Sequence, residues 1–247
     1  MHVGVIHLGR TGTFIVRRLL AADRRCVVYD RSARTVVELA AERAHGAASV
    51  PDLVNELDGP RTIWLTGRAS EIDPTISELL PYIEPDDVIL DCSDSDYADS
   101  VRRAAELAVR HVHYLDVGIC GEMQAGSSYC LMLGGDESIA RSLQPLLELL
   151  APRGYLYCGP AGAGRFVATI HDGIECRMTA AYSEGFRMLR AASTAWTDHG
   201  PDYEFALSDI VDIWRRGAPV ASPVMDRAVR EQAAANEASC GLPEMRR

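Results

Sequence analysis

Three polar side chains with catalytic chemistry recur close together in the stretch GRFVATIHDGIEC, residues 164–176. At about 100° per residue, positions 168, 171, 172, 175 and 176 share one face of a helix. Imidazole titrates near neutral pH, so His171 is a candidate acid or base, poised by Asp172 or Glu175. The alternative is an interior histidine that forms a hydrogen bond and transfers no proton.

The same helix face also carries four types of metal ligand. His171, Asp172, Glu175 and Cys176 could all bind a metal ion by residue type. Neighbouring residues on a helix seldom converge on one ion, however. We therefore predict no metal and keep a metal site as a minor alternative.

A glycine-rich turn follows the first apolar run of the chain. The stretch His7-Leu8-Gly9-Arg10-Thr11-Gly12 keeps the second and third glycines of the Gly-x-Gly-x-x-Gly pattern and has histidine at the first. In that pattern the second glycine lets the backbone approach a pyrophosphate and the third lets the helix pack closely. We predict that Gly9, Arg10, Thr11 and Gly12 bind a dinucleotide.

An acidic residue ends the second predicted strand, VVYD. Asp30 lies at the distance from the glycine turn at which an acidic residue accepts the ribose hydroxyls of NAD. Its neighbour Arg31 could instead meet the 2′-phosphate of NADP. The prediction is NAD or NADP, with NAD favoured; the alternative is a doubly wound domain whose groove binds no dinucleotide.

The elements that must position these residues alternate along the first two thirds of the chain. Short apolar runs predict strands, and amphipathic segments between most of them, among them residues 136–149, predict helices. This alternation predicts a parallel sheet covered on both faces, a Rossmann-like doubly wound α/β domain over residues 1–160. The predicted strands are 2–8, 25–30, 61–66, "DDVILDCS", "VHYLDVG", "SYCLMLGG" and "GYLYCG".

No further strand pattern follows Pro160. Residues 161–247 are predicted to form an all-helical, shortened C-terminal domain, with helices at about 164–193, 204–216 and 221–235. A long helix with the apolar stretch MTAAYSEGFRMLRAA cannot bury that surface on a domain of this size. We predict a homodimer formed through the helical domain.

Composition narrows the classes of function. A formal charge of -10 disfavours a nucleic-acid partner, and no apolar run is long enough to span a membrane. All 25 basic residues are arginine, which excludes a lysine base or a lysine Schiff base. Seven cysteines without a Cys-x-x-Cys pair predict free thiols in a reducing cytoplasm.

The order of several segments is more specific than any single motif. GVIHLGRTG, VVYDR, DVG with YCLMLGGD, GYLYCGPAGAGRFV, IHDGIE and DIVDIWRRG follow one another over about residues 1–230. In this order the chain resembles the 6-phosphogluconate dehydrogenases, most closely their shorter bacterial form, within the β-hydroxyacid dehydrogenases. The resemblance implies a nucleotide-binding domain followed by a helical, dimerising domain, and NAD(P)-dependent oxidation of a sugar acid phosphate.

The resemblance also implies that the catalytic face has changed. The family's lysine, which takes the hydroxyl proton, corresponds to Ala168, and its His-Asn pair to His171 and Asp172. The family's acid corresponds to Glu175, which is unchanged, and its tyrosine to Cys176.

Other positions implied by the resemblance differ as well. The family's Val-Pro near the nicotinamide corresponds to Gly67-Arg68, and its Asn to Asp94. Its substrate-holding Ser-Gly-Gly corresponds to Cys120-Gly121-Glu122, and Arg165 is a candidate for anion affinity.

Two functions remain open. The first is a diverged oxidoreductase that uses His171 and acts on a small hydroxy acid, sugar or imine-type substrate, because added carboxylates disfavour phosphogluconate. The second is a non-redox relative, either a silent subunit or an isomerase, lyase or cyclase that reuses the cleft.

Overall fold

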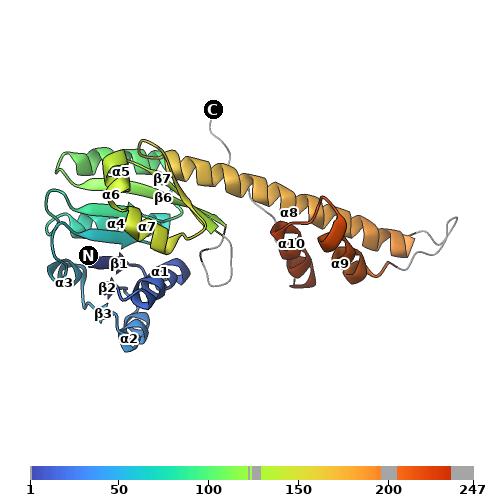
Figure 1. Cartoon of the computed structure of the whole chain (residues 1–247), viewed down its shortest axis with the longest axis horizontal. Helices are drawn as coiled ribbons and strands as arrows, with labels where there is room; N and C mark the ends of the chain where they lie inside the picture. The colour runs from blue at the N-terminus through green and yellow to red at the C-terminus, as the bar shows by residue number, and fades with distance from the viewer. Residues whose placement is uncertain (1, 122, 124–128, 196–204, 235–247) are drawn as a thin grey trace. The chain divides into compact units, whose positions relative to one another are not determined.

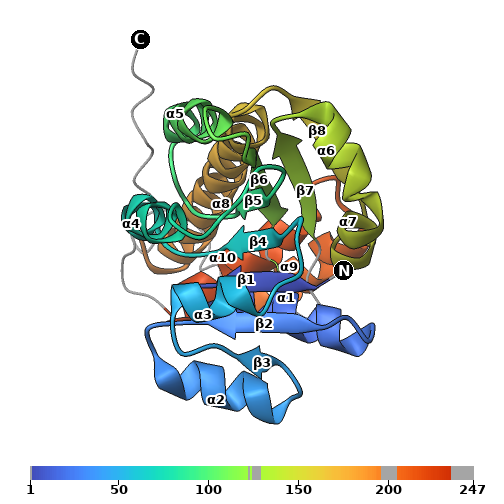
Figure 2. The same ribbon diagram turned by 90° about the vertical axis from the view of Figure 1, so that its left-hand side faces the viewer.

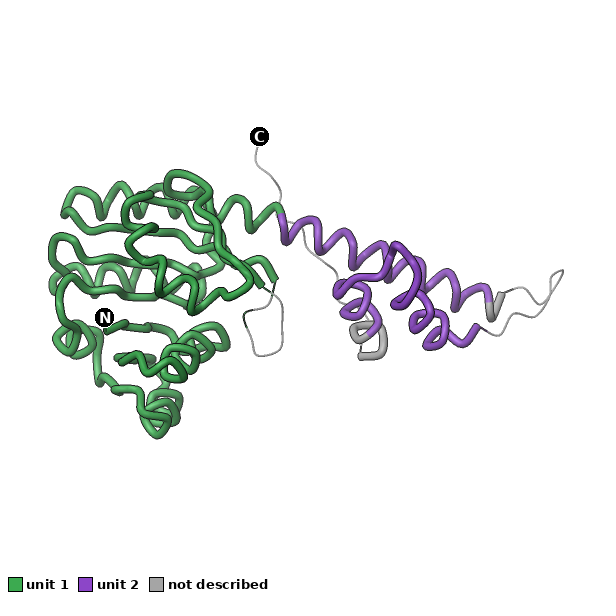
Figure 3. Tube along the Cα trace, viewed as in Figure 1, with its two compact units in different colours: residues 1–170 green, residues 171–247 purple. Residues whose placement is uncertain are grey.

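The computed structural model describes residues 2–121, 123, 129–195 and 205–234. The chain divides into two compact units, residues 1–170 and 171–247 (Figure 3). The first unit therefore ends ten residues after the predicted boundary at 160. The reason is local: the first turns of the long helix α8 (Ala163–Ala195) pack on the sheet, where Ala168 contacts the backbone position of Gly118.

The first unit, drawn from blue to yellow in Figure 1, is built on an eight-stranded sheet with the order β3-β2-β1-β4-β5-β6-β7-β8, whose strands are all labelled in Figure 2. Beyond the predicted strands, the structure shows the short edge strand β3. The strands are β1 (Val3–Ile6), β2 (Cys26–Tyr29), β3 (His45–Gly46), β4 (Thr62–Leu65), β5 (Val88–Asp91), β6 (His113–Gly121), β7 (Tyr129–Gly134) and β8 (Tyr155–Gly159).

The prediction of a wholly parallel sheet is wrong for the last two strands. Strands β1 to β6 are parallel, but β7 pairs antiparallel with β6, and β8 runs parallel to β7. Only seven residues separate β6 from β7, too few for a helical crossover, which parallel pairing would require. The sheet is therefore mixed at this edge.

Helices cover both faces of the sheet (Figure 2). Helices α1, α2, α6 and α7 contribute to one buried apolar cluster, and α3, α4 and α5 to the other. Strands such as VGVI and VILD are buried at every position, as expected for strands covered on both sides. The helices are α1 (Arg10–Ala21), α2 (Ala33–Ala41), α3 (Val50–Asn55), α4 (Ala69–Leu79), α5 (Tyr97–Ala108), α6 (Glu137–Ser142) and α7 (Gln144–Leu150).

The helices differ from the prediction in two places. The single helix predicted for 136–149 is divided into α6 and α7, because Leu143 ends one helix and Pro145 occupies the first turn of the next. Helix α3 was not predicted; Ser49 caps it through the backbone N–H of Asp52.

The second unit is helical. The part of α8 from His171 onward packs with α9 (Leu207–Gly217) and α10 (Pro223–Ala234) around Phe186, Val211, Met225 and Ala228. The ring of Phe186 stacks between Tyr182 and Trp214. Among the described helices, none combines the length and apolar character needed to cross a membrane.

Candidate functional site

A cleft of about 390 Å³ opens at the carboxyl ends of the central parallel strands. Its walls come from the residues that follow β1, β2, β4 and β5. Strands β2 and β3 lie on one side of β1, and β4, β5 and β6 lie on the other, so the strand order reverses between β1 and β4. Doubly wound domains bind ligands at such a switch point. The lining residues are His7, Gly9, Thr11, Asp30, Arg31, Thr66, Gly67, Arg68, Glu71, Cys92 and Asp94.

The glycine turn forms one wall of this cleft. Gly9 precedes α1, and a Cβ added there would meet nothing within 4 Å. At Gly12, by contrast, a Cβ would collide with the carbonyl oxygen of His7 and the hydroxyl of Thr66. The third glycine is thus required for close packing of α1 on β1, and the second leaves the surface of the turn open to a ligand.

The first turn of α1 has the properties of an anion site. It contains no acidic residue, and no side chain caps its first N–H groups. Uncapped N–H groups and the positive end of the helix dipole favour phosphate there. This geometry fits the pyrophosphate of a dinucleotide.

Asp30 connects the end of β2 to the glycine turn. Its Oδ2 accepts a hydrogen bond from the backbone N–H of Leu8 at 2.6 Å, and its Oδ1 accepts one from Ser32 at 2.7 Å. A carboxylate has about four acceptor positions, so Asp30 keeps capacity for ribose hydroxyls. Arg31 beside it is exposed and lines the cleft.

The opposite wall is the start of α4. Asp94 accepts a hydrogen bond from the backbone N–H of Ala69 at 2.6 Å, and Glu71 accepts one from Arg68 at 2.8 Å. Both carboxylates therefore cap α4, and their charge also faces the cleft. Arg68, which corresponds to the proline of the family's Val-Pro, lines the cleft.

His7 occupies the position of the missing first glycine. Its φ is +68°, a left-handed conformation that costs a side-chain-bearing residue about 1–2 kcal/mol. Its buried ring donates or accepts at Thr75 Oγ1, 2.8 Å from Nε2, and burial lowers the pKa of the imidazole. A Cβ at Gly67 would lie 2.7 Å from the ring, so the histidine fits because residue 67 has no side chain.

A buried charge network lies behind the cleft. Asp91, at the end of β5, accepts hydrogen bonds from Arg103 and Tyr114 at 3.1 and 2.6 Å. Arg165, predicted to bind substrate anions, is 8% exposed and donates to the carbonyl oxygen of Asp91 at 3.0 Å. Its main contact is therefore with the protein interior.

The predicted catalytic residues belong to the second unit. Nδ1 of His171 lies 3.3 Å from the carboxylate of Asp172, and the side chain of Asp172 is 64% exposed. Glu175 forms an ion pair with Arg227 of α10 at 2.8 Å. Sequence reasoning missed Arg227, because nothing in the pattern of α10 indicates that it meets α8.

The possible ligand atoms of His171, Asp172 and Glu175 lie within 4.8 Å of one another. Arg227 pairs with the Glu175 carboxylate and would compete with a metal ion for it. Glu122 lies outside the described residues, while Cys120 and Gly121 end β6. Cys176 is disulfide-bonded, so the prediction of a free thiol is wrong at this position.

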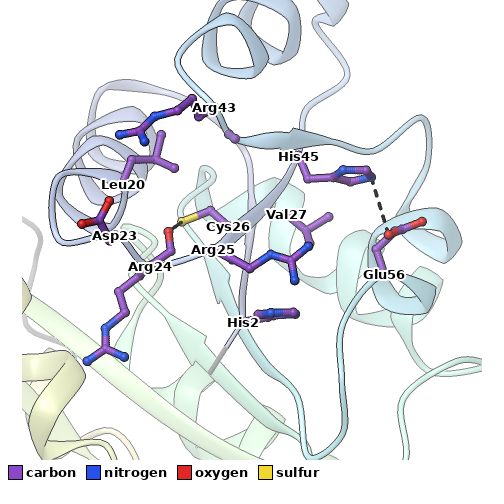
Figure 4. A pocket seen from close by; sticks show the side chains of 11 residues that line it. His2, Leu20, Asp23, Arg24, Arg25, Cys26, Val27, Arg43, His45 and Glu56 are labelled. Carbon is purple, nitrogen blue, oxygen red and sulfur yellow. Dashed lines mark hydrogen bonds and ion pairs between the residues drawn. The ribbon is translucent and has the colours of Figure 1, made fainter.

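A second hollow of about 290 Å³ lies at the amino ends of β1, β2 and β3 (Figure 4). Arg24, Arg25 and Arg43 line it, and His45 lies 3.6 Å from Glu56. The carboxyl ends of α1 and α2 border it, and such ends favour cations. These arginines therefore have a structural explanation, and no predicted site residue lies there.

The fold and the first cleft together define a dinucleotide-binding α/β protein with a helical second unit. A family model for the NAD binding domain of 6-phosphogluconate dehydrogenase matches residues 2–159. The chain belongs to the 6-phosphogluconate dehydrogenase family.

Relatives from two organisms match nearly the whole chain. An NAD-dependent, decarboxylating 6-phosphogluconate dehydrogenase of Haloferax volcanii is 34% identical over 239 residues, covering 94% of this chain and 76% of the relative. The YqeC protein of Bacillus subtilis, a proposed 6-phosphogluconate dehydrogenase, is 31% identical over 240 residues, covering 96% and 77%.

Solved structures support the fold. The 6-phosphogluconate dehydrogenase of Plasmodium falciparum superposes with a TM-score of 0.75 at 22% identity, over 93% of this chain and 50% of that one. The 3-hydroxyisobutyrate dehydrogenase of Mycobacterium tuberculosis gives 0.70 at 20% identity, over 94% of both chains.

Proposed function

We propose that the protein is an NAD(P)-dependent oxidoreductase that acts on a small hydroxy acid, sugar or imine-type substrate. The observation that carries this proposal is the cleft itself. An open glycine turn, an uncapped helix start and Asp30 lie together at the switch point of the sheet.

The residues present fit a dinucleotide in three places. The first turn of α1 would bind the pyrophosphate, Asp30 the ribose hydroxyls, and Gly67, Arg68 and Asp94 the part of the cofactor near α4. When bound, the nicotinamide supplies the hydride chemistry, so the protein has to orient the substrate and move one proton.

His171 is the proposed proton carrier. Its Nδ1 faces the Asp172 carboxylate, which fixes one ring nitrogen and leaves the other for substrate. Glu175 is oriented by Arg227 and would act as the second acid or base. Ala168, at the position of the family's lysine, is 3% exposed and offers no titratable group.

Electrostatics favour a substrate with little negative charge. Asp94 lines the cleft and Asp172 follows His171, and both stand where the family has asparagine, so each adds a carboxylate near the expected substrate. Arg165 is engaged with Asp91 and does not offset these charges. The two relatives above are named for phosphogluconate, which carries two anionic groups, a carboxylate and a phosphate, and we propose that this chain prefers a neutral or singly charged substrate.

Equilibrium titration tests the first part of the proposal. We expect NAD or NADP to bind in the micromolar range and to raise the melting temperature, as ligands of the native state do. Gly12→Ala should abolish binding because its Cβ would displace the turn, whereas Gly185→Ala, where nothing lies within 4 Å, should leave it unchanged. Absence of binding to the unsubstituted protein would refute the proposal.

A second candidate function is a non-redox relative. The specific observation in its favour is Ala168, whose methyl group packs against β6 where the family carries its base. Dinucleotide binding without hydride transfer to or from hydroxy acids, sugars and imines would favour this candidate. Loss of such transfer in His171→Asn, with unchanged dinucleotide affinity, would favour the oxidoreductase.

A further inference from the structure

His7 has a structural role that the glycine pattern does not account for. Its side chain is 8% exposed, yet it lines the cleft between the end of β2 and the start of α4. The ring occupies the space left by Gly67. The glycine pattern has no side chain at this position, whereas this chain has an imidazole that lines the cleft.

The hydrogen bonds of the ring define its protonation. Thr75 Oγ1 donates to the carbonyl oxygen of Glu71 at 2.8 Å, and a hydroxyl has one proton to donate. Thr75 therefore accepts at His7, which places the imidazole proton on Nε2. Burial lowers the pKa of His7 and keeps the ring neutral, so Nδ1 is an acceptor.

Nδ1 is the ring atom available to a ligand. Within the described residues Nδ1 forms no hydrogen bond. The buried polar atoms that lack a partner there are Trp64 Nε1, Ser100 Oγ and Arg165 Nε, so Nδ1 is not one of them and stays accessible. The charged groups around the ring are Glu71 on α4 and Asp30 and Arg31 after β2. His7 lines the cleft, so a ligand bound there has access to its ring.

We propose that His7 determines cofactor specificity: its Nδ1 accepts a hydrogen bond from a hydroxyl of the adenine ribose, beside Asp30, and so favours NAD over NADP. This inference rests on the proposed function. His7 Nδ1 and the Asp30 carboxylate are acceptors of residues that line the same cleft, and a ribose 2′-hydroxyl supplies a donor. A 2′-phosphate instead brings oxygen acceptors and about 1.5 to 2 negative charges.

The test is the ratio of dissociation constants for NADP and NAD, measured by calorimetry. We expect at least about tenfold preference for NAD in the unsubstituted protein. His7→Gly removes the acceptor and supplies the residue that a left-handed backbone favours, which offsets part of the cost of losing the buried ring. It should weaken NAD binding about tenfold, the effect of one hydrogen bond, and leave NADP binding nearly unchanged.

Two further variants sharpen the result. His7→Asn, which tolerates the same backbone and keeps an acceptor oxygen, should retain part of the preference. His111→Gly is the matched control, because His111 has a φ of +57° and does not line the cleft; it should change nothing.

Each outcome is decisive. Equal affinities in the unsubstituted protein, or an unchanged ratio in His7→Gly, would overturn the role of His7 while dinucleotide binding itself stands. Tighter binding of both dinucleotides to His7→Gly would show that the ring obstructs the cleft. No binding to any variant would overturn the proposed function together with this inference.

Discussion

At the scale of single residues, His7 and Gly67 form one packing pair across β1 and β4. The glycine pattern loses its first glycine at His7, and residue 67 provides the space for the ring. His7 has a left-handed backbone, and its ring fits beside β4 because Gly67 has no Cβ. Neither residue type explains the local structure without the other.

We predict that Gly67→Ala destabilises the protein by about 1–3 kcal/mol, because the new Cβ would lie 2.7 Å from the His7 ring. In His7→Gly/Gly67→Ala this cost should fall by at least about 0.5 kcal/mol, as expected for residues in contact. Urea unfolding of the four proteins measures the coupling. Strictly additive free energies would show that the pair does not interact.

A second prediction concerns Ala168. Ala168→Lys should lower the free energy of unfolding by about 1–3 kcal/mol and should not produce phosphogluconate oxidation, because position 168 is 3% exposed and packs on β6. Ala180→Lys, an exposed alanine of the same helix, is the control and should cost less than 0.5 kcal/mol. Measurable turnover of phosphogluconate by Ala168→Lys would contradict this prediction.

The sequence predicted many of the residues that line the cleft and missed others. Gly9, Thr11, Asp30, Arg31, Gly67, Arg68 and Asp94 were all expected near a cofactor and line one cleft. Their assignment to a dinucleotide stays a prediction. Thr66, Glu71 and Cys92 were missed, since their side chains enter the cleft only through the register of β4, α4 and β5.

At the scale of elements, the start of α8 depends on one buried carboxylate. Asp116 of β6 accepts hydrogen bonds from the backbone N–H groups of Gly162 and Arg165, at 2.5 and 2.7 Å. Gly134 and Gly164 are without side chains where these elements meet, and a Cβ at either would collide with its neighbours. A strand thereby caps a helix that begins 47 residues later.

Asp116→Ala should therefore destabilise the protein by about 2–5 kcal/mol, because two buried N–H groups lose their acceptor. Asp136→Ala, which removes the exposed cap of α6, should cost about 1 kcal/mol. Chemical unfolding of both variants makes the comparison. Equal losses would show that Asp116 is an ordinary helix cap.

The same residue predicts a pH dependence. Burial raises the pKa of Asp116 above its value in the unfolded chain. The folded state then binds its proton more tightly, so the contribution of Asp116 is fully present below about pH 4, the ordinary value for Asp, and is lost as pH rises through the raised pKa. Relative to Asp116→Asn, the unsubstituted protein should lose stability from pH 4 upward; a parallel profile would refute this.

At the scale of the whole molecule, the helical unit leaves apolar surface exposed. Ile174, Met178 and Met188 of α8 are 53, 37 and 68% exposed, and Ile213 of α9 is 61% exposed. A second copy of the chain would cover such a surface, and the prediction of a homodimer rests on it.

We expect sedimentation velocity to show a dimer that Ile174→Glu shifts toward monomer, because the new carboxylate would be buried in the contact. Arg190→Glu introduces a larger change of charge on another face of the same helix and should leave the dimer intact. A monomeric unsubstituted protein at micromolar concentration would refute the prediction.

The sequence by itself determined the α/β domain followed by helices, the glycine turn and the acid after the second strand. These are local signals, since apolar periodicity and glycine spacing act within a few residues. Only the tertiary structure decided the reversed edge strands, the pairing of His7 with Gly67, the Asp116 cap and the Glu175–Arg227 ion pair. Each joins residues far apart in the chain, and such contacts depend on packing and register.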